Sequence, residues 1–338
     1  MNSTGLSEQS HRAAGRARPI ATLLVLATVL PELFSGSTPL AGFPNPGLLL
    51  FLFVGYGMAV LLVRELAVRC RIGLAGLFLL GLAYSVFNEG LLAKTLIVER
   101  NLPIALYDHY GYWLGISFPW AAGIGAWHAC ASVMFPILLT HHFFPQTKDR
   151  PWLNGKIALA VGCLVMLLAC AVFLGASAKG LKGTPRQLVV LLALMSAGFL
   201  LGGALKGTVL NRPSHLAIKP LLLGFSILIP FWGLGALASA KAPPAGFFLA
   251  WVAVIVLYAW LLRRQHWLAL PSFLFFGVGW YLHNAAQATV FVSIPGKDPV
   301  RALITAAVDG LILFVLLRQI GRADTREKLD CQRNLVGV

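Results

Sequence analysis

Six side chains that a hydrocarbon environment should reject lie inside long apolar stretches of this sequence. They are Glu32, Glu89, His128, His283, Asn284 and Asp309. Because an ionisable group in a transmembrane helix costs several kcal/mol, it usually faces the bundle interior and marks a functional site. Desolvation favours the protonated form of a buried carboxylate, so the carboxylate can act as a general base near neutral pH, and a neighbouring histidine and amide can stabilise an oxyanion. This chemistry indicates an intramembrane hydrolase.

The composition is that of a polytopic membrane protein. The 338 residues are 58% hydrophobic and 12% charged, with a mean hydropathy of +0.79, whereas about a quarter of the residues of a soluble domain are charged. The net charge of +15 does not indicate a nucleic-acid partner, since the lysines and arginines fall between apolar segments rather than on one soluble face. The five cysteines form no disulfide framework, because they lie in apolar runs or in segments placed in the cytosol.

The fold class predicted is an all-α transmembrane bundle of about ten helices. A span needs about 20 apolar residues, and prolines near most of the expected starts are compatible with a first helical turn. The predicted helices are 19–35, 46–66, 72–97, 115–141, 154–177, 186–205, 218–239, 244–263, 268–293 and 299–318. Residues 19–318 then form one domain between two cytosolic tails, 1–18 and 319–338. The first span is short and contains Pro31-Glu32, which suggests a broken or partly re-entrant segment.

The distribution of positive charge gives the expected orientation. With the amino terminus in the cytosol, 19 of the 27 lysines and arginines fall on the cytosolic side, which fits the positive-inside rule. An even number of helices also places the carboxyl terminus in the cytosol. No cleavable signal peptide precedes the first span. We expect an integral protein of a prokaryotic plasma (inner) membrane, whose partners are the lipid bilayer and a membrane-embedded or small-molecule substrate.

The depth of the polar side chains predicts a single site in the outer half of the bundle. Asn88-Glu89 on 72–97 and His283-Asn284 on 268–293 both lie about 12 to 15 Å below the outer surface, at 1.5 Å per residue. His128 falls at a similar level if Pro119 begins its helix. The expected polar cavity is completed by two further carboxylates, namely Glu32 at a shallower level and Asp309 from below.

Helical spacing adds polar neighbours to these groups. Residues four apart share a helix face, and the pairs so placed are Ser85 with Glu89, His128 with Ser132, and His283 with Gln287. Trp113, Trp120 and Trp127 recur every seven residues, which predicts either a cavity wall that includes Trp127 or simple packing with an interfacial belt. Arg64-Glu65 is interpreted as a snorkelling surface pair, and 107–112 as an interfacial loop.

Three segments partly resemble the CAAX-protease and bacteriocin-processing family of intramembrane glutamic-type proteases. Asn88-Glu89 stands where that family has a glutamate pair, and Lys94 follows Glu89 by five residues, where an arginine four residues on is expected. An isoleucine or glycine replaces phenylalanine ahead of His128, and His283 is followed by Gln287 rather than asparagine. The resemblance implies a protease with Glu89, His128, His283 and Asn284 as catalytic residues. That family's site is expected toward the cytosol, whereas the charge pattern places this one outward.

A second resemblance, carried by Glu32 to Pro39, Arg64 to Ala67 and Asn88 to Leu91, is to a group of uncharacterised prokaryotic membrane proteins. It implies no activity.

Two other functions fit the same residues. A proton-coupled secondary transporter of a small solute or lipid uses an interrupted helix and titrating residues near the membrane midplane. For either function, the expected substrate-binding residues are Glu32, Asn88, Gln287, Asp309 and Trp127. A metal or haem site held by His128 and His283 is the third reading. It lacks the CxxCH and Glu-x-x-His patterns of such sites, so no cofactor is predicted.

Overall fold

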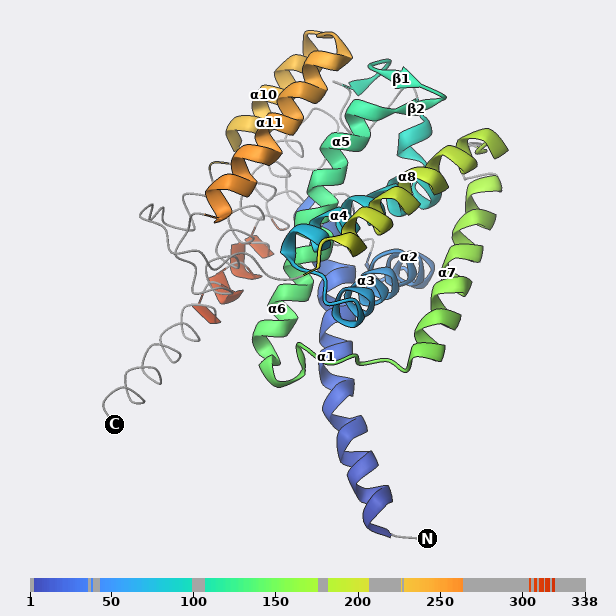
Figure 1. Cartoon of the computed structure of the whole chain (residues 1–338), viewed down its shortest axis with the longest axis vertical. Helices are drawn as coiled ribbons and strands as arrows, with labels where there is room; N and C mark the ends of the chain where they lie inside the picture. The colour runs from blue at the N-terminus through green and yellow to red at the C-terminus, as the bar shows by residue number, and fades with distance from the viewer. Residues whose placement is uncertain are drawn as a thin grey trace, which may run out of the picture.

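A computed structural model of the chain is mostly helical (Figure 1). The structure describes residues 3–35, 38, 43–98, 107–175, 182–206, 226 and 228–263, and single positions between 304 and 319. Within this part, six helices are long and apolar enough to cross a membrane. They are Pro46–Arg69, Leu74–Leu92, Phe118–Phe143, Gly155–Leu174, Pro185–Ala204 and Pro244–Leu261.

The described elements follow the predicted order. They are α1 (Ser3–Ser35), α2 (Pro46–Leu52), η2 (Phe53–Met58), α3 (Ala59–Arg69), α4 (Leu74–Ser85), η3 (Val86–Leu92), η4 (Thr95–Ile97), β1 (Tyr112–Trp113), β2 (Ile116–Ser117), α5 (Phe118–Trp127), η6 (His128–Met134), α6 (Phe135–Phe143), η7 (Pro145–Thr147), α7 (Gly155–Leu174), α8 (Pro185–Ala204), α10 (Leu228–Ser239) and α11 (Pro244–Arg263). The predicted helix 268–293 lies outside the described residues, and so does most of 299–318.

The first helix is longer and more regular than predicted. The expected break at Pro31-Glu32 is wrong, because α1 continues through both of its prolines to Ser35. Its C-terminal part is held by packing rather than by its own propensity, since Leu23, Ala27 and Leu30 are buried where α1 packs against η2 and α6. The N-terminal part of α1 projects from the bundle at the bottom of Figure 1.

Two further boundaries differ from prediction. The helix expected over 72–97 ends at Leu92, because Lys94 adopts a left-handed conformation (φ 61°) that a right-handed helix cannot include. The buried Lys94 ammonium then donates a hydrogen bond of 2.7 Å to the Gly175 carbonyl, and burial lowers the pKa of this amine. The helix expected from residue 115 begins later, because β2, the second strand of the antiparallel pair β1–β2, occupies Ile116–Ser117 and α5 begins at Phe118.

Loops that the charge pattern assigned to one side of the membrane do meet at one end of the bundle. At the end predicted to face the cytosol, Arg69 donates a hydrogen bond to the Leu153 carbonyl, and Ile72 forms a β-bridge with Lys206. At the opposite end, Gln187 reaches the Gly115 carbonyl at 3.0 Å and Lys241 reaches the Asp108 carbonyl at 2.7 Å. The spans between these contacts therefore run alternately up and down.

Glycines allow α4 to approach its neighbours closely. A Cβ added to Gly76 would lie 2.6 Å from the Gly202 carbonyl oxygen on α8, and one added to Gly81 would lie 2.5 Å from the Ala129 Cα on η6. Small residues at such crossings bring helix backbones together where lipid offers no hydrophobic driving force. Glycines thus place α4, which continues into η3, directly beside the helix of His128.

Three spans change from α-helix to π-helix at the same level of the bundle. The segments are η2, η3 and η6, each of six or seven residues. In η3 the change is visible in the hydrogen bond from the Ala93 amide to the Asn88 carbonyl, five residues back. Short π-helical segments are rare and often occur at functional sites, and these three carry Tyr56, Glu89 and His128.

The prediction of a surface pair at Arg64-Glu65 is wrong. Both residues are buried, with relative exposures of 0% and 1%. The segment between α6 and α7 folds over them, so that the Arg64 guanidinium lies 3.6 Å from the centre of the Trp152 ring. Snorkelling requires a path to water, and this segment closes that path.

Candidate functional site

Glu89 and His128 form a direct hydrogen-bonded pair inside the bundle. Glu89 Oε1 lies 2.9 Å from His128 Nε2, and His128 Nδ1 lies 2.9 Å from Ser132 Oγ. If the carboxylate is ionised, the imidazole donates a hydrogen bond to it from Nε2 and accepts a hydrogen bond from the Ser132 hydroxyl at Nδ1. A carboxylate, an imidazole and a hydroxyl in this order form an arrangement that can take up and return a proton.

The second carboxylate oxygen of Glu89 is hydrogen-bonded by a residue at the end of the bundle that carries η4. Thr95 Oγ1 on η4 donates a short hydrogen bond to Glu89 Oε2, and the Trp120 indole nitrogen donates to Thr95 Oγ1 at 3.0 Å. The side chain of Glu89 is 11% exposed, whereas that of His128 is 1% exposed. The carboxylate is therefore the member of the pair closer to the surface, and His128 supports it from behind.

A second carboxylate, that of Glu32, is linked to His128 through Tyr56. Glu32 Oε1 accepts a hydrogen bond of 2.5 Å from the Tyr56 hydroxyl, and Glu32 Oε2 accepts one of 2.7 Å from Thr38. The Tyr56 ring is in turn 5.9 Å, centre to centre, from the His128 ring. Both carboxyl oxygens of the buried Glu32 are thus hydrogen-bonded, as polar groups in an apolar interior must be, and Tyr56 links Glu32 to the Glu89–His128 pair.

Tyr84 closes the site from α4. Its ring lies 5.6 Å from the ring of His128 and 6.1 Å from that of Tyr56. Its hydroxyl donates to the Gly55 carbonyl at 3.1 Å and accepts from the Asn88 amide at 2.9 Å. Asn88 therefore orients Tyr84 rather than pairing with Glu89.

The structure brings together four of the nine predicted site residues. These are Glu32, Asn88, Glu89 and His128, and a fifth, Trp127, is buried next to His128 at the end of α5. The remaining four, His283, Asn284, Gln287 and Asp309, lie outside the described residues.

One predicted neighbour is wrong. Ser85 was expected to support Glu89 from four residues earlier, but within the described residues its hydroxyl has no hydrogen-bond partner. The same four-residue spacing does bring Ser132 to His128 within η6, so spacing along one helix does not by itself decide which hydroxyl reaches Glu89. Thr95, beyond the end of the helix, takes that place.

The expected tryptophan stripe is also divided. Trp113 lies on β1 and is 66% exposed, whereas Trp120 is buried against Thr95. The three tryptophans therefore do not form one wall. Within the described ranges, no group of three or more histidine, cysteine or acidic residues is placed to hold a metal ion.

Comparison with known proteins gives the family. Residues 21–317 match the model of an uncharacterised membrane protein family. The chain belongs to this family. No curated protein and no solved structure matches it. Membership of this family and the apolar helices together make the chain an integral membrane protein.

Several residues of the site could not be found from single-residue signals in the sequence. Tyr56, Tyr84 and Thr95 are ordinary components of membrane helices or their ends, and nothing in their spacing relates them to His128. The one available signal was the position of Thr95, six residues after Glu89, just past the end of an apolar run. Tertiary packing alone brings these side chains together.

Proposed function

We propose that the protein is an intramembrane hydrolase in which Glu89 is the general base. The observation that carries this proposal is the 2.9 Å contact between Glu89 Oε1 and His128 Nε2, in a carboxylate whose side chain is 11% exposed and whose second oxygen accepts a hydrogen bond from Thr95. The partial resemblance of this region to glutamic-type intramembrane proteases supports the same reading.

The reaction follows from the positions of the two groups. A water molecule beside Glu89 loses a proton to the Glu89–His128 pair as its oxygen bonds to a substrate carbonyl carbon. The tetrahedral intermediate then collapses, the carbonyl re-forms, and the leaving group departs with the proton that the pair returns. Ser132 keeps the imidazole oriented throughout, and His283 and Asn284 are the predicted donors to the oxyanion.

Glu89→Gln is expected to abolish hydrolysis while leaving substrate binding largely intact, because the amide keeps the shape of the carboxyl group but cannot accept the proton. General-base catalysis typically contributes 10²- to 10⁴-fold, so we expect a fall of about that size in kcat. The measurement is product release, by mass spectrometry, from membrane-partitioning peptide amides and esters added to the reconstituted protein.

A matched control is Asp149→Asn, which removes an exposed carboxylate in the α6–α7 segment at the far end of the bundle. Its activity should equal that of the unaltered protein. Full activity of the Glu89→Gln protein would make Glu89 a structural residue and remove the hydrolase proposal.

A proton-coupled secondary transporter is the second candidate, and the Glu32–Tyr56 pair is the observation that favours it. Glu89, bonded to His128, and Glu32, bonded to Tyr56 beside His128, provide successive proton positions in the interior. In this case Glu89→Gln should abolish proton-coupled uptake into vesicles yet preserve solute exchange, since the amide resembles the protonated carboxyl. A pH-sensitive dye inside the vesicles reports the coupled proton movement.

The orientation and the membrane complete the proposal. We place Glu89 in the outer half of a bundle of about ten helices in a prokaryotic plasma membrane, with both tails cytosolic. Single cysteines introduced at Lys179 and Arg212 should then react with a membrane-impermeant maleimide from opposite sides of the membrane. Labelling of both from the same side would contradict this topology.

A further inference from the structure

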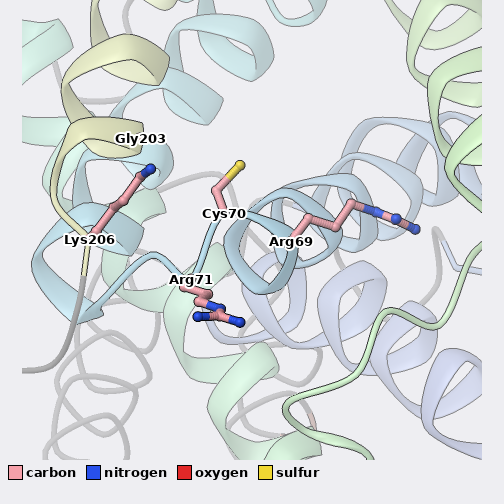
Figure 2. A pocket seen from close by; sticks show the side chains of 5 residues that line it. All are labelled: Arg69, Cys70, Arg71, Gly203 and Lys206. Carbon is pink, nitrogen blue, oxygen red and sulfur yellow. The ribbon is translucent and has the colours of Figure 1, made fainter.

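We propose that a pocket at the end of the bundle opposite Glu89 binds the phosphate headgroup of an anionic phospholipid. The pocket has a volume of about 780 Å³ and is lined by Arg69, Cys70, Arg71, Gly203 and Lys206 (Figure 2). Three of these five residues are cationic and none is acidic. Basic pockets between transmembrane helices on the cytoplasmic side are typical binding sites for anionic headgroups.

Of the three cations that line the pocket, Arg71 and Lys206 are the candidates for binding the ligand. Figure 2 shows the Arg69 side chain turned away from Lys206, and its guanidinium is bonded to Glu65 at 3.1 Å and to the Leu153 carbonyl at 2.5 Å. Arg69 therefore lines the pocket with its stem. Arg71 and Lys206 remain to neutralise the phosphate.

The backbone holds these two residues at a fixed separation. Ile72 and Lys206 form an antiparallel β-bridge, and the Gly73 amide donates to the Leu205 carbonyl at 3.3 Å. Arg71 adopts a left-handed conformation with φ 54°, and the following amide, that of Ile72, bonds back to the Ala67 carbonyl at 2.8 Å. The pocket is thus preorganised, because its two walls are joined by backbone hydrogen bonds rather than by side chains alone.

The depth of the pocket favours a lipid over a soluble anion. It lies where the candidate spans Pro46–Arg69 and Pro185–Ala204 end and where Leu74–Leu92 begins, which is the level of lipid headgroups. Leu201 on α8 and Leu205, which directly follows that helix, are 60% and 45% exposed. A headgroup held by Arg71 and Lys206 would therefore have an apolar surface beside it for its acyl chains.

Cys70 lines the same pocket and provides a natural reporter of its occupancy. The experiment measures the rate of alkylation at Cys70, located by peptide mass spectrometry, in the full chain reconstituted into nanodiscs. The three conditions are phosphatidylcholine alone, phosphatidylcholine with phosphatidylglycerol, and phosphatidylcholine with inorganic phosphate. Phospholipid that remains bound after transfer to detergent is quantified in parallel.

Phosphatidylglycerol should slow alkylation of Cys70 and remain bound to the protein, whereas inorganic phosphate should do neither. The double variant Arg71→Gln, Lys206→Gln should lose both effects and bind the lipid about tenfold more weakly or worse, since each cation near the surface contributes to binding of an anionic lipid. The charge reversal Lys206→Glu should give the same loss. A control double variant at the other end, Lys182→Gln with Arg186→Gln, should behave as the unaltered protein.

Three results would overturn the proposal. Protection of Cys70 by inorganic phosphate in neutral nanodiscs would indicate a soluble-anion site. Slowing that persists in the Arg71→Gln, Lys206→Gln protein would be an effect of membrane surface potential rather than of binding. Equal alkylation rates in neutral and anionic nanodiscs would exclude an occupied lipid site.

Discussion

Replacement of Arg64 by methionine is expected to lower the free energy of unfolding by about 3–5 kcal/mol, the range for breaking a buried ion pair by removing one partner. The Arg64 guanidinium is fully buried and contacts the Glu65 carboxylate at 2.7 Å, the His141 ring at 3.2 Å, and the Thr147 and Lys148 carbonyls at 3.0 and 2.9 Å. Methionine fills a similar volume but leaves those two carbonyls unpaired in the interior.

The loss of stability should be concentrated in the segment between α6 and α7. Glu65 would keep Arg69 and the backbone amides of Trp152 and Leu153 as hydrogen-bond partners. The segment itself would lose the Arg64 guanidinium, which stacks on Trp152 and donates hydrogen bonds to the Thr147 and Lys148 carbonyls. Arg64→Lys should give an intermediate loss, because an ammonium keeps the charge but not the planar set of donors.

Unfolding by SDS in mixed micelles, followed by circular dichroism, measures the effect of each Arg64 variant. The control is Arg186→Met, which removes an exposed arginine in the first turn of α8, at the other end of the bundle. A surface change of this kind should fall within about 0.5 kcal/mol. Equal stability of the Arg64→Met and Arg186→Met proteins would show that the buried network contributes nothing to the fold.

Gly81→Ala is expected to destabilise the protein by about 1–3 kcal/mol, the usual effect of overpacking a close contact. The added Cβ would lie 2.5 Å from the Ala129 Cα and 2.8 Å from its Cβ, so the backbone of η6 must move. Alanine improves helix propensity by only about 1 kcal/mol, which does not offset that movement. Gly81→Leu should have a larger effect in the same direction.

The same substitution should weaken the Glu89–His128 contact, because Ala129 follows His128 in the chain and α4 leads directly into η3. A double-mutant cycle in unfolding free energy measures this: Glu89→Gln should change stability less in the Gly81→Ala protein than in the unaltered one. The control is Gly233→Ala on α10, where an added Cβ meets no side chain or neighbouring element of the described part of the chain within 4 Å and where alanine should be neutral or stabilising. Additive effects of Gly81→Ala and Glu89→Gln would contradict the proposed coupling.

The sequence was sufficient for the helical class and for most of the helix positions. Apolar runs of about 20 residues have one stable form in a membrane, because every backbone amide must be satisfied within the segment. The positive charges also grouped the loops correctly into two sets, as the contacts of Arg69 with Leu153 and of Gln187 with Gly115 show.

Helix ends were less accurate, because they depend on local conformation that hydropathy does not report. The left-handed Lys94 ends one helix five residues early, and a strand pair occupies the start of the expected fourth helix. Pro31 likewise suggested a break in the first helix, whereas tertiary packing keeps α1 helical through this residue.

The sequence by itself determined which side chains are chemically conspicuous, since Glu32, Glu89 and His128 stand out wherever hydrocarbon surrounds them. Only the tertiary structure decided how they are partnered. Thr95 rather than Ser85 bonds Glu89, and Tyr56 lies between Glu32 and His128. The physical reason is that these partners come from different segments of the chain: Thr95 lies past the end of the helix that carries Glu89, and Tyr56 belongs to another span. Close packing at Gly81 brings α4, which leads into the segment of Glu89, into contact with the segment of His128.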